Sequence, residues 1–350
     1  MLRASSLRLL LEARQRYHCE YGGYLSNHLL HYVVALDACG VPEPILAEAT
    51  RRYSAKLEPA RPETPTDDWR PWKGRRTNFL GLLRHLDETP LERLFEPILE
   101  SAAAQIWGAA FHGIISVGYG CRSGHDTLVK EGLAYLIGYA CVAGKEPVSP
   151  DPTDALSATE VLSAATRLPA IPFEPKASFD DALRQIKSQL DFSALDIDLS
   201  SITSAHGVAG LADFFEQTVM PAVLDLHASC ADGRDFFLLH GVTSADSLLQ
   251  VLRCRHLQSL SLAKKLVHHF VRGLYLTYVR QGRPPVSKRV LNSRGYVSDA
   301  EYAKAVDSIV FDDEHFIKLA MVCREQNRRQ VFMQTHESVK RGHWKFSAKM

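Results

Sequence analysis

Long apolar segments with helical spacing are the feature that most limits the fold of this 350-residue chain. Within them the apolar side chains recur at intervals of three and four residues, and typical helix signals flank them. Thr89 and Ser298 stand at helix starts, and Gly40 stands at a helix stop. The alternation of period two that marks strands is missing. These patterns predict an all-α fold, a compact multi-helix bundle with long proline-rich connections.

The predicted helices cover most of the chain. They span residues 5–18, 26–38, 44–53, 94–106, 109–117, 128–143, 211–230, 236–252, 260–280, 298–308 and 311–324, with further helix starts at Ser157 and Ser178. Prolines cluster between residues 145 and 175, which favours a crossover there. We predict a single domain over residues 1–350, with its core at about 20–325 and a polar, basic tail or surface helix at 326–350.

Charge and cysteine usage exclude several classes of protein. Lysine plus arginine (41) nearly balance aspartate plus glutamate (40), so the positive surface typical of a nucleic-acid-binding protein is not expected. The seven cysteines are scattered without a C-x-x-C pair, which is typical of reduced thiols. No apolar run reaches the roughly 18 residues that span a bilayer. We expect a soluble, cytoplasmic protein without nucleic-acid or membrane partners, and the sequence leaves its oligomeric state open.

Four histidines occur inside apolar segments that are predicted to form separate helices: His28, His112, His240 and His315. A buried imidazole needs partners for its ring nitrogens, and coordination of one metal ion would satisfy all four rings. Nitrogen ligands without cysteine suit iron, zinc, copper or nickel and disfavour magnesium or calcium. The pattern predicts a histidine-dominated metal site between facing helices. The alternative is four structural core histidines.

Lys318 follows His315 by three residues, so both side chains would project from one face of a helix. An ammonium is repelled by a metal cation, but burial and the field of the metal both lower its pKa from about 10.4. The neutral amine could ligate the metal, act as a base, or take up CO2 to form a carbamate. Alternatively, the amine reaches water along the protein surface. Asp312 and Asp313 could accept hydrogen bonds from imidazole N–H groups, or could cap the helix.

Further residues are weaker candidates for the surroundings of the site. His31 lies three residues after His28 and could contribute or simply pack. Of the adjacent His268 and His269, at most one can point toward the site, and His269 is kept as a pocket candidate. Tyr119 could line an aromatic pocket or belong to the core.

Other known motifs give little support to alternative chemistries. The dipeptide His125-Asp126 is typical of HD-type metal phosphohydrolases, but the flanking Arg122 and Gly124 suggest a loop where that family has a helix. No G-x-G-x-x-G follows a strand, and no Walker A motif or G-x-S-x-G elbow is present. A nicotinamide or flavin bound by a Rossmann fold is therefore unsupported.

Taken together, several segments resemble the questin oxidase-like family. They are Asn27-His28-Leu-Leu-His31 with Leu36-Asp-Ala-Cys-Gly40, Phe111-His112-Gly-Ile-Ile-Ser-Val-Gly-Tyr-Gly120, Glu131-Gly-Leu-Ala134, Leu239-His240-Gly-Val-Thr-Ser244 and Asp312-Asp-Glu-His315-Phe-Ile-Lys318. The resemblance covers about residues 20–325, in order. The sequence departs from it at Ser116, where a larger or more polar residue is expected, and in the segment from Pro150 to Pro175.

The resemblance implies an oxidoreductase that opens a ring of aromatic polyketides such as anthraquinones, by oxygen insertion or C–C cleavage. Family members are described as NADPH-dependent Baeyer–Villiger-type oxidases, and some resemble non-haem iron dioxygenases with four histidines and a carboxylated lysine. Carried over to this chain, His28, His112, His240 and His315 would bind Fe(II), and Lys318 would be the modified lysine. NADPH is then a candidate co-substrate.

We therefore predict a metal-dependent oxidoreductase that uses O2 on an aromatic or quinone-type small molecule. Two rival functions stay open. One is a helical metallohydrolase in which zinc or manganese generates hydroxide. The other is a non-catalytic helical binding protein whose histidines are structural.

Overall fold

The part of the chain that the structure describes is almost entirely helical. This computed structural model describes residues 2–23, 25–60, 64–74, 78–139, 165, 167–174, 176–190, 197–230, 235–285 and 297–340. Within these ranges the only named strands are the short antiparallel pair β1 (Glu20–Tyr21) and β2 (Leu25–Ser26). The all-α prediction is confirmed.

The helices of the first part of the chain include one at residues 79–88 that the sequence analysis did not predict, and the helix predicted over residues 5–18 ends at Ala13. They are α1 (Ala4–Ala13), α2 (Leu29–Ala38), α3 (Glu43–Ser54), the 3-10 turn η1 (Arg70–Trp72), α4 (Phe79–Glu88), α5 (Leu91–Ala102), the 3-10 turn η3 (Ala103–Gln105), α6 (His112–Ser123) and α7 (Asp126–Tyr139). The predicted helix 109–117 starts later than expected, because residues 109–111 have positive φ angles and form a left-handed turn instead.

The second part of the chain contributes the remaining helices. They are α9 (Phe179–Lys187), α10 (Gly207–Phe214), the π-helical turn η5 (Phe215–Val219), α11 (Met220–Ser229), α12 (Phe236–Leu252), α13 (Leu260–Arg280), α15 (Asp299–Asp307), α16 (Glu314–Glu325) and α17 (Arg329–Lys340). The bounds predicted for α12 and α13 are confirmed. Ser298 forms the full capping box with Glu301 at the start of α15, as its spacing indicates.

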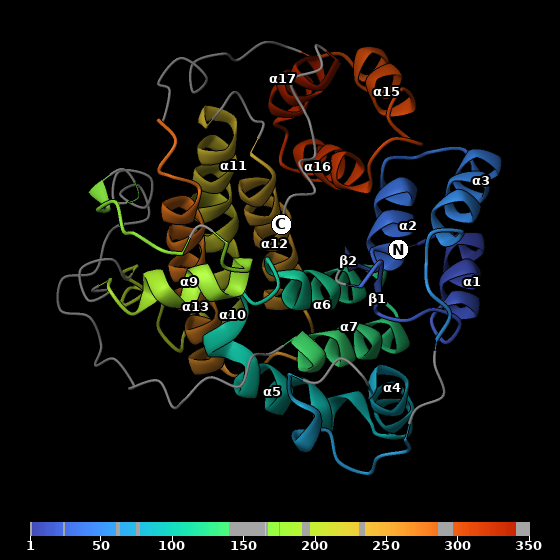
Figure 1. Cartoon of the computed structure of the whole chain (residues 1–350), viewed down its shortest axis with the longest axis horizontal. Coiled ribbons are helices and arrows are strands. Elements are labelled where there is room, and N and C mark those ends of the chain that lie inside the picture. Colours follow the sequence, from blue (N-terminus) through green and yellow to red (C-terminus); the bar gives the residue numbers. More distant parts are fainter. Residues whose placement is uncertain are drawn as a thin grey trace.

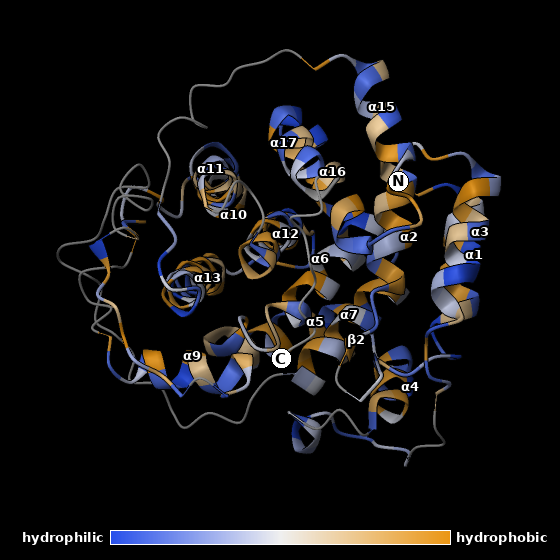
Figure 2. Cartoon of the chain, turned by 45° about the horizontal axis from the view of Figure 1, so that its top comes forward, coloured by the Kyte–Doolittle hydropathy of each residue, from blue (hydrophilic) through white to orange (hydrophobic). Residues whose placement is uncertain are grey.

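Helices from opposite ends of the chain pack together at the centre of the molecule. There α6 packs against α7 and α12, while α16, near the end of the chain, packs against both α2 and α12 (Figure 1). Apolar residues colour much of α12 and α13, whereas the outer helices α1 and α17 carry many hydrophilic residues (Figure 2). The hydrophobic effect therefore holds the starts of α2, α6, α12 and α16 close to one another.

Two glycines set the close spacing around α6. A Cβ at Gly118 would lie 2.4 Å from the Cα of Ser247 in α12, and a Cβ at Gly132 in α7 would lie 2.6 Å from the backbone of Val117. Any side chain at either position would push the helices apart. These contacts explain why glycine punctuates this apolar region of the sequence.

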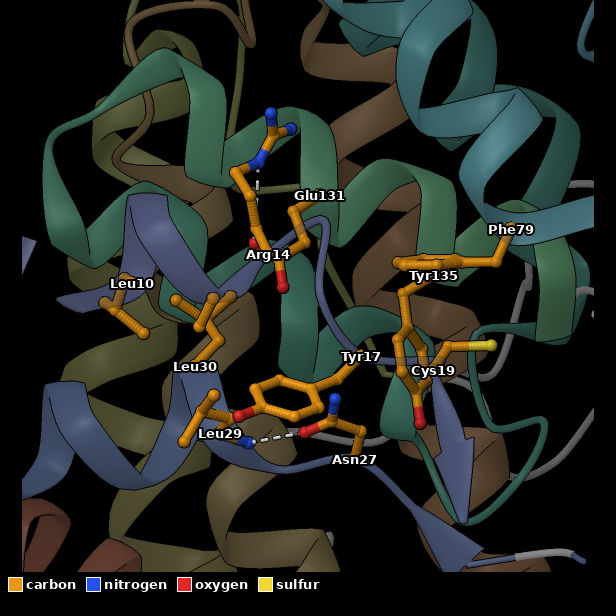
Figure 3. A pocket seen from close by; sticks show the side chains of 11 residues that line it. Leu10, Arg14, Tyr17, Cys19, Asn27, Leu29, Leu30, Phe79, Glu131 and Tyr135 are labelled. Atoms are coloured by element: carbon orange, nitrogen blue, oxygen red, sulfur yellow. Dashed lines mark hydrogen bonds and ion pairs between the residues drawn. The ribbon is translucent and has the colours of Figure 1, made fainter. Parts of the chain in front are cut away.

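A small cavity between α1, α2 and α7 lies apart from the histidines and is a structural feature (Figure 3). Its volume of about 20 Å³ leaves room for roughly one water molecule. Arg14 of α1 approaches Glu131 of α7, with 3.8 Å between Nε and Oε2, and also binds Asp87 at 2.7 Å. On the same cavity, Asn27 Oδ1 accepts a hydrogen bond from the backbone N–H of Leu29 and so fixes the start of α2.

Several predictions lie outside the described residues. They are the helix start at Ser157, most of the crossover 145–175 and the last ten residues of the tail. The assignment of residues 1–350 to a single domain stays a prediction. Among the described residues, no helix has both the length and the apolar character that crossing a membrane requires.

The Glu131 carboxyl makes stability depend on pH. Burial raises its pKa from 4.5 to about 7, although Arg14 opposes this shift. The folded protein therefore holds this proton more tightly than the unfolded chain does, and the wild type loses stability as the pH rises from about 5 to 8. We expect Glu131→Gln to reduce this loss, with a gain in the free energy of unfolding on the order of 2 kcal/mol at pH 8. Urea unfolding at several pH values measures it.

The control is Glu12→Gln, which changes an exposed glutamate of α1. Parallel pH profiles of wild type, Glu12→Gln and Glu131→Gln would contradict the assignment of the proton to Glu131.

Candidate metal centre

The structure brings the four predicted histidines together in one ring. His28 precedes α2 as its N-cap, His112 is the first residue of α6, and His240 and His315 lie near the starts of α12 and α16. The ring centroid of His28 lies 4.7 Å from those of both His112 and His315. The centroid of His240 lies 4.8 Å from that of His112 and 4.9 Å from that of His315. All four side chains are buried.

Each of the four rings has its Nδ1 next to an oxygen acceptor. His28 Nδ1 lies 3.0 Å from Glu314 Oε1, and His315 Nδ1 lies 2.6 Å from Asp313 Oδ1. His240 Nδ1 lies 2.8 Å from the carbonyl oxygen of Phe236, and His112 Nδ1 contacts the carbonyl oxygen of Ala109. Since carbonyl and carboxylate oxygens accept, each Nδ1 donates its proton. In a neutral ring, Nε2 then carries the free lone pair.

The Nε2 atoms complete the geometry of a ligand set. The Nε2 atoms of His28, His240 and His315 are buried and have no hydrogen-bond partner among the described residues. One ring nitrogen from each of His28, His112 and His315 lies within 4.8 Å of the others. Buried polar atoms without partners are rare in native proteins. A transition metal that accepts imidazole nitrogen fits this donor set.

Electrostatics keep these rings in the form that a metal requires. Burial lowers the pKa of His28 well below 6.5, and Lys318 and the neighbouring histidines lower it further. The pKa of His240 is lowered in the same way by burial and by His112 and His315. Both rings are therefore neutral near pH 7, and a neutral imidazole can donate its lone pair to a metal.

Asp313 performs both of the roles that the sequence left open. It is the N-cap of α16, and Oδ1 accepts hydrogen bonds from both the backbone N–H and the ring Nδ1 of His315. Burial alone would raise the pKa of Asp313, but the hydrogen bonds from the ring and the backbone N–H of His315 oppose this effect, and the pKa is lowered to about 2. The carboxylate therefore stays ionised and fixes the His315 ring in one orientation.

Lys318 lies within the core on α16 and is fully buried. Its Nζ has no hydrogen-bond partner among the described residues. Burial lowers its pKa from 10.5 to about 8, while Glu314 and Asp313 act in the opposite direction. The alternative that the amine reaches water along the surface is not what the structure shows. An amine in this position can be deprotonated at modest cost.

A cavity of about 490 Å³ opens beside the histidines, a size within the usual range for small-molecule sites. It is lined by His28, His112, His315, the carboxylates Asp180, Asp312, Asp313 and Glu314, the aromatic residues Tyr21, Tyr139, Phe179, Phe236 and Phe237, and by Leu25, Ser26, Lys56, Ala109, Ala110 and Ser178. The lining includes both aromatic and acidic side chains, so the cavity suits a flat apolar molecule that carries hydrogen-bond donors.

The aromatic residues that line the cavity are packed by ring contacts. The rings of Phe179 and Phe237 stack at 4.6 Å, and the Arg280 guanidinium lies 4.5 Å from the Phe237 centroid. Phe236 contacts both His240 and His315, at 4.4 and 4.8 Å between centroids. Phe236 thus joins the cavity to the histidine ring.

The weaker candidates Asp312, His31 and Tyr119 differ in where they lie relative to the cavity. Asp312 lines the cavity, whereas His31 lies behind the ring of histidines, 5.3 Å from His28 between centroids. His31 Nε2 lies 3.0 Å from Ser116 Oγ, so the small residue at this position, where the sequence departs from the family resemblance, makes room for a hydrogen bond. Tyr119 packs on the far side of His31 at 4.9 Å. It is not among the residues that line the cavity.

His269 lies on α13 in a basic neighbourhood. Burial, together with the charges of Arg272 and Lys187, lowers its pKa from 6.5 to about 3. It is not among the residues that line the cavity.

Sequence reasoning missed three contributors to the site. Glu314, which holds His28, stands beside the two aspartates that were selected, and its place in the first turn of α16 was a usable signal. The carbonyl groups of Ala109 and Phe236 hold His112 and His240. A carbonyl group leaves no signal in residue type, because every residue has one.

A second group of possible metal ligands lies near the surface and comprises Glu92, Asp126 and His256. Both carboxylate oxygens of Asp126 lie 3.0 Å from the Arg255 guanidinium, which already neutralises this residue. Asp126 opens α7 and belongs to the His125-Asp126 dipeptide. It is separate from the ring of four histidines.

The fold and the site define a helical protein with a buried histidine cluster beside a ligand-sized cavity. The chain belongs to the questin oxidase-like family, whose model matches residues 25–323. This match confirms the resemblance that the motifs indicate. No curated protein is similar enough in sequence to count as a match. Family membership indicates an oxidoreductase that acts on a small molecule of the polyketide type.

The unpartnered amine of Lys318 predicts a stability change in the metal-free protein. We expect Lys318→Met to raise the free energy of unfolding by about 1 to 3 kcal/mol, because methionine fills a similar volume without a buried polar group. Denaturant unfolding in CO2-free buffer at pH 7 measures the effect. Lys304→Met, at an exposed position of α15, is the control. Unchanged or lower stability of Lys318→Met would mean that the amine is satisfied in solution.

Proposed function

We propose that this protein is a metal-dependent oxidoreductase that uses O2 to open a ring of an aromatic or quinone-type polyketide. His28, His112, His240 and His315 hold Fe(II) through Nε2. The observation that carries this proposal is a cluster of four buried imidazoles, each with Nδ1 committed to an oxygen acceptor. Ring nitrogens of His28, His112 and His315 lie within 4.8 Å of one another, and the His240 ring adjoins those of His112 and His315. Four rings in this arrangement present nitrogen ligands only, which suits iron better than magnesium or calcium.

A ferrous ion bound there supplies a redox centre and open positions for O2 and for a substrate oxygen. The chain itself contributes binding and orientation. Phe179, Phe236 and Phe237 offer apolar surface to a planar ring system, and the carboxylates that line the same cavity can accept hydrogen bonds from phenolic hydroxyl groups. The substrate is thereby held flat beside the histidines.

Lys318 is the proposed proton-handling or ligand residue. Its burial and the nearby Glu314 and Asp313 give an amine with a pKa of about 8, so the neutral form is accessible near pH 7. In that form it can act as a base beside the histidines, or react with CO2, releasing a proton, to give a carbamate whose oxygen is an anionic ligand. Mass spectrometry of the intact protein, with and without CO2, distinguishes the two.

Metal content tests the proposal. We expect protein purified without an affinity tag or chelator to contain a stoichiometric amount of iron, and His240→Ala and His315→Ala to lose it. His256→Ala, which alters the surface group with Glu92 and Asp126, serves as the matched control and should retain the iron. Loss of a direct ligand should weaken binding by more than the roughly 10- to 100-fold that loss of a hydrogen-bond partner costs.

The identity of the metal separates the rival functions. Zinc or manganese that is lost in His315→Ala would favour a metallohydrolase, and no metal in any variant would overturn the proposal. O2 uptake with hydroxylated quinones, measured with and without NADPH, then shows whether the iron protein is an oxidase and whether it needs this co-substrate.

A further inference from the structure

Residues 109–111 form a left-handed turn directly before α6. The φ angles of Ala109, Ala110 and Phe111 are 48°, 54° and 67°. For residues with a Cβ, this conformation is sterically strained, and it normally occurs at single positions. Three such residues in succession, none of them glycine, therefore require contacts that hold them.

Contacts fix both ends of this turn. At its start, the N–H of Ala109 donates a hydrogen bond to Asp180 Oδ1 at 2.7 Å, from a residue 71 positions away in α9. At its end, Phe111 is fully buried, its N–H donates to the carbonyl oxygen of Trp107 at 3.1 Å, and its ring packs on Phe270. Asp180 is the only one of these partners that lines the cavity.

The left-handed turn redirects the carbonyl group of Ala109. In the right-handed helix that the sequence predicts from residue 109, this carbonyl would accept from the N–H of Gly113. In the structure it accepts from both the backbone N–H and the ring Nδ1 of His112. The turn is therefore what supplies His112 with the acceptor that sets its tautomer.

We infer that Asp180 is a positioning residue for His112. Its carboxylate holds the N–H of Ala109, and the carbonyl of that same residue holds the His112 ring. The inference rests on the proposed metal site, since His112 is one of its ligands. Asp180 and Ala109 both border the cavity, so the interaction that orients this ligand lies on the surface where substrate would bind.

The test compares Asp180→Ala with Asp180→Asn. Both remove the charge, but asparagine keeps an oxygen that can accept from Ala109. Two readouts are used: hydrogen exchange of the Ala109 amide in the metal-free protein, and the Kd for Co²⁺ measured against a chelator. In Asp180→Ala we expect exchange to accelerate at least about tenfold and Co²⁺ binding to weaken by about 10- to 100-fold. Asp180→Asn should stay within about threefold of wild type in both.

Two further variants sharpen the test. Asp181→Asn changes the neighbouring carboxylate, which faces Ser178 and Arg184 and not the turn, and should match wild type. Ala109→Gly combined with Asp180→Ala should recover part of the lost affinity, because glycine adopts a positive φ without the steric penalty. If Asp180→Ala does not fold, this double variant replaces it, with Ala109→Gly alone as its reference.

The outcomes distinguish this inference from the proposed function. If His112→Ala binds Co²⁺ as wild type does, the proposed site is wrong. If His112→Ala loses Co²⁺ while Asp180→Ala keeps both its affinity and the protection of the Ala109 amide, only the positioning role is overturned. Equal weakening in Asp180→Asn and Asp180→Ala would also overturn it, since the charge and not the hydrogen bond would then matter.

Discussion

The hydrogen bond from each Nδ1 to a fixed oxygen is the interaction on which the site depends. Without it, a neutral imidazole could carry its proton on either nitrogen and turn within its pocket. Two of the acceptors are carboxylates at the start of α16, and two are carbonyl groups at the starts of α6 and α12. Helix starts are convenient places for such rings, because the backbone there changes direction and brings acceptors beside the first turn.

At Lys318, the burial of the side chain conflicts with the polarity of its amine. The interior of a protein disfavours an amine without partners, and its presence at a fully buried position is a local violation of the rules that stabilise the rest of the core. Violations of this kind gather at functional sites. The acidic residues at the start of α16 compensate in part, because Glu314 and Asp313 favour the charged form that burial opposes.

The sequence was sufficient for the helical class, for the bounds of α12 and α13, and for selecting four histidines that the structure brings together, because apolar periodicity and helix caps are local signals. The role of these histidines as metal ligands stays a prediction. The sequence was insufficient at residues 109–111, where the apolar pattern continues but the backbone turns left-handed. That conformation depends on Asp180, which is distant in the sequence. The roles of Glu314 and of the two carbonyl groups were missed for the same reason. They are defined by partners that only the packed helices bring near, whereas each histidine carries its chemistry in its own side chain.

The contact between His28 and Glu314 joins residues 286 positions apart. Closing a loop of this length is slow compared with forming a hairpin or a helix, since the entropy of the intervening chain opposes it. On the ribosome, α2, α6 and α12 emerge long before α16 does. A nascent chain therefore exposes three of the histidines while the fourth, and the carboxylates that orient two of the rings, are not yet synthesised. If the histidines bind a metal ion as proposed, its capture would be one of the last events in the maturation of this protein, and any metal bound earlier would be held by an incomplete and weaker set of ligands.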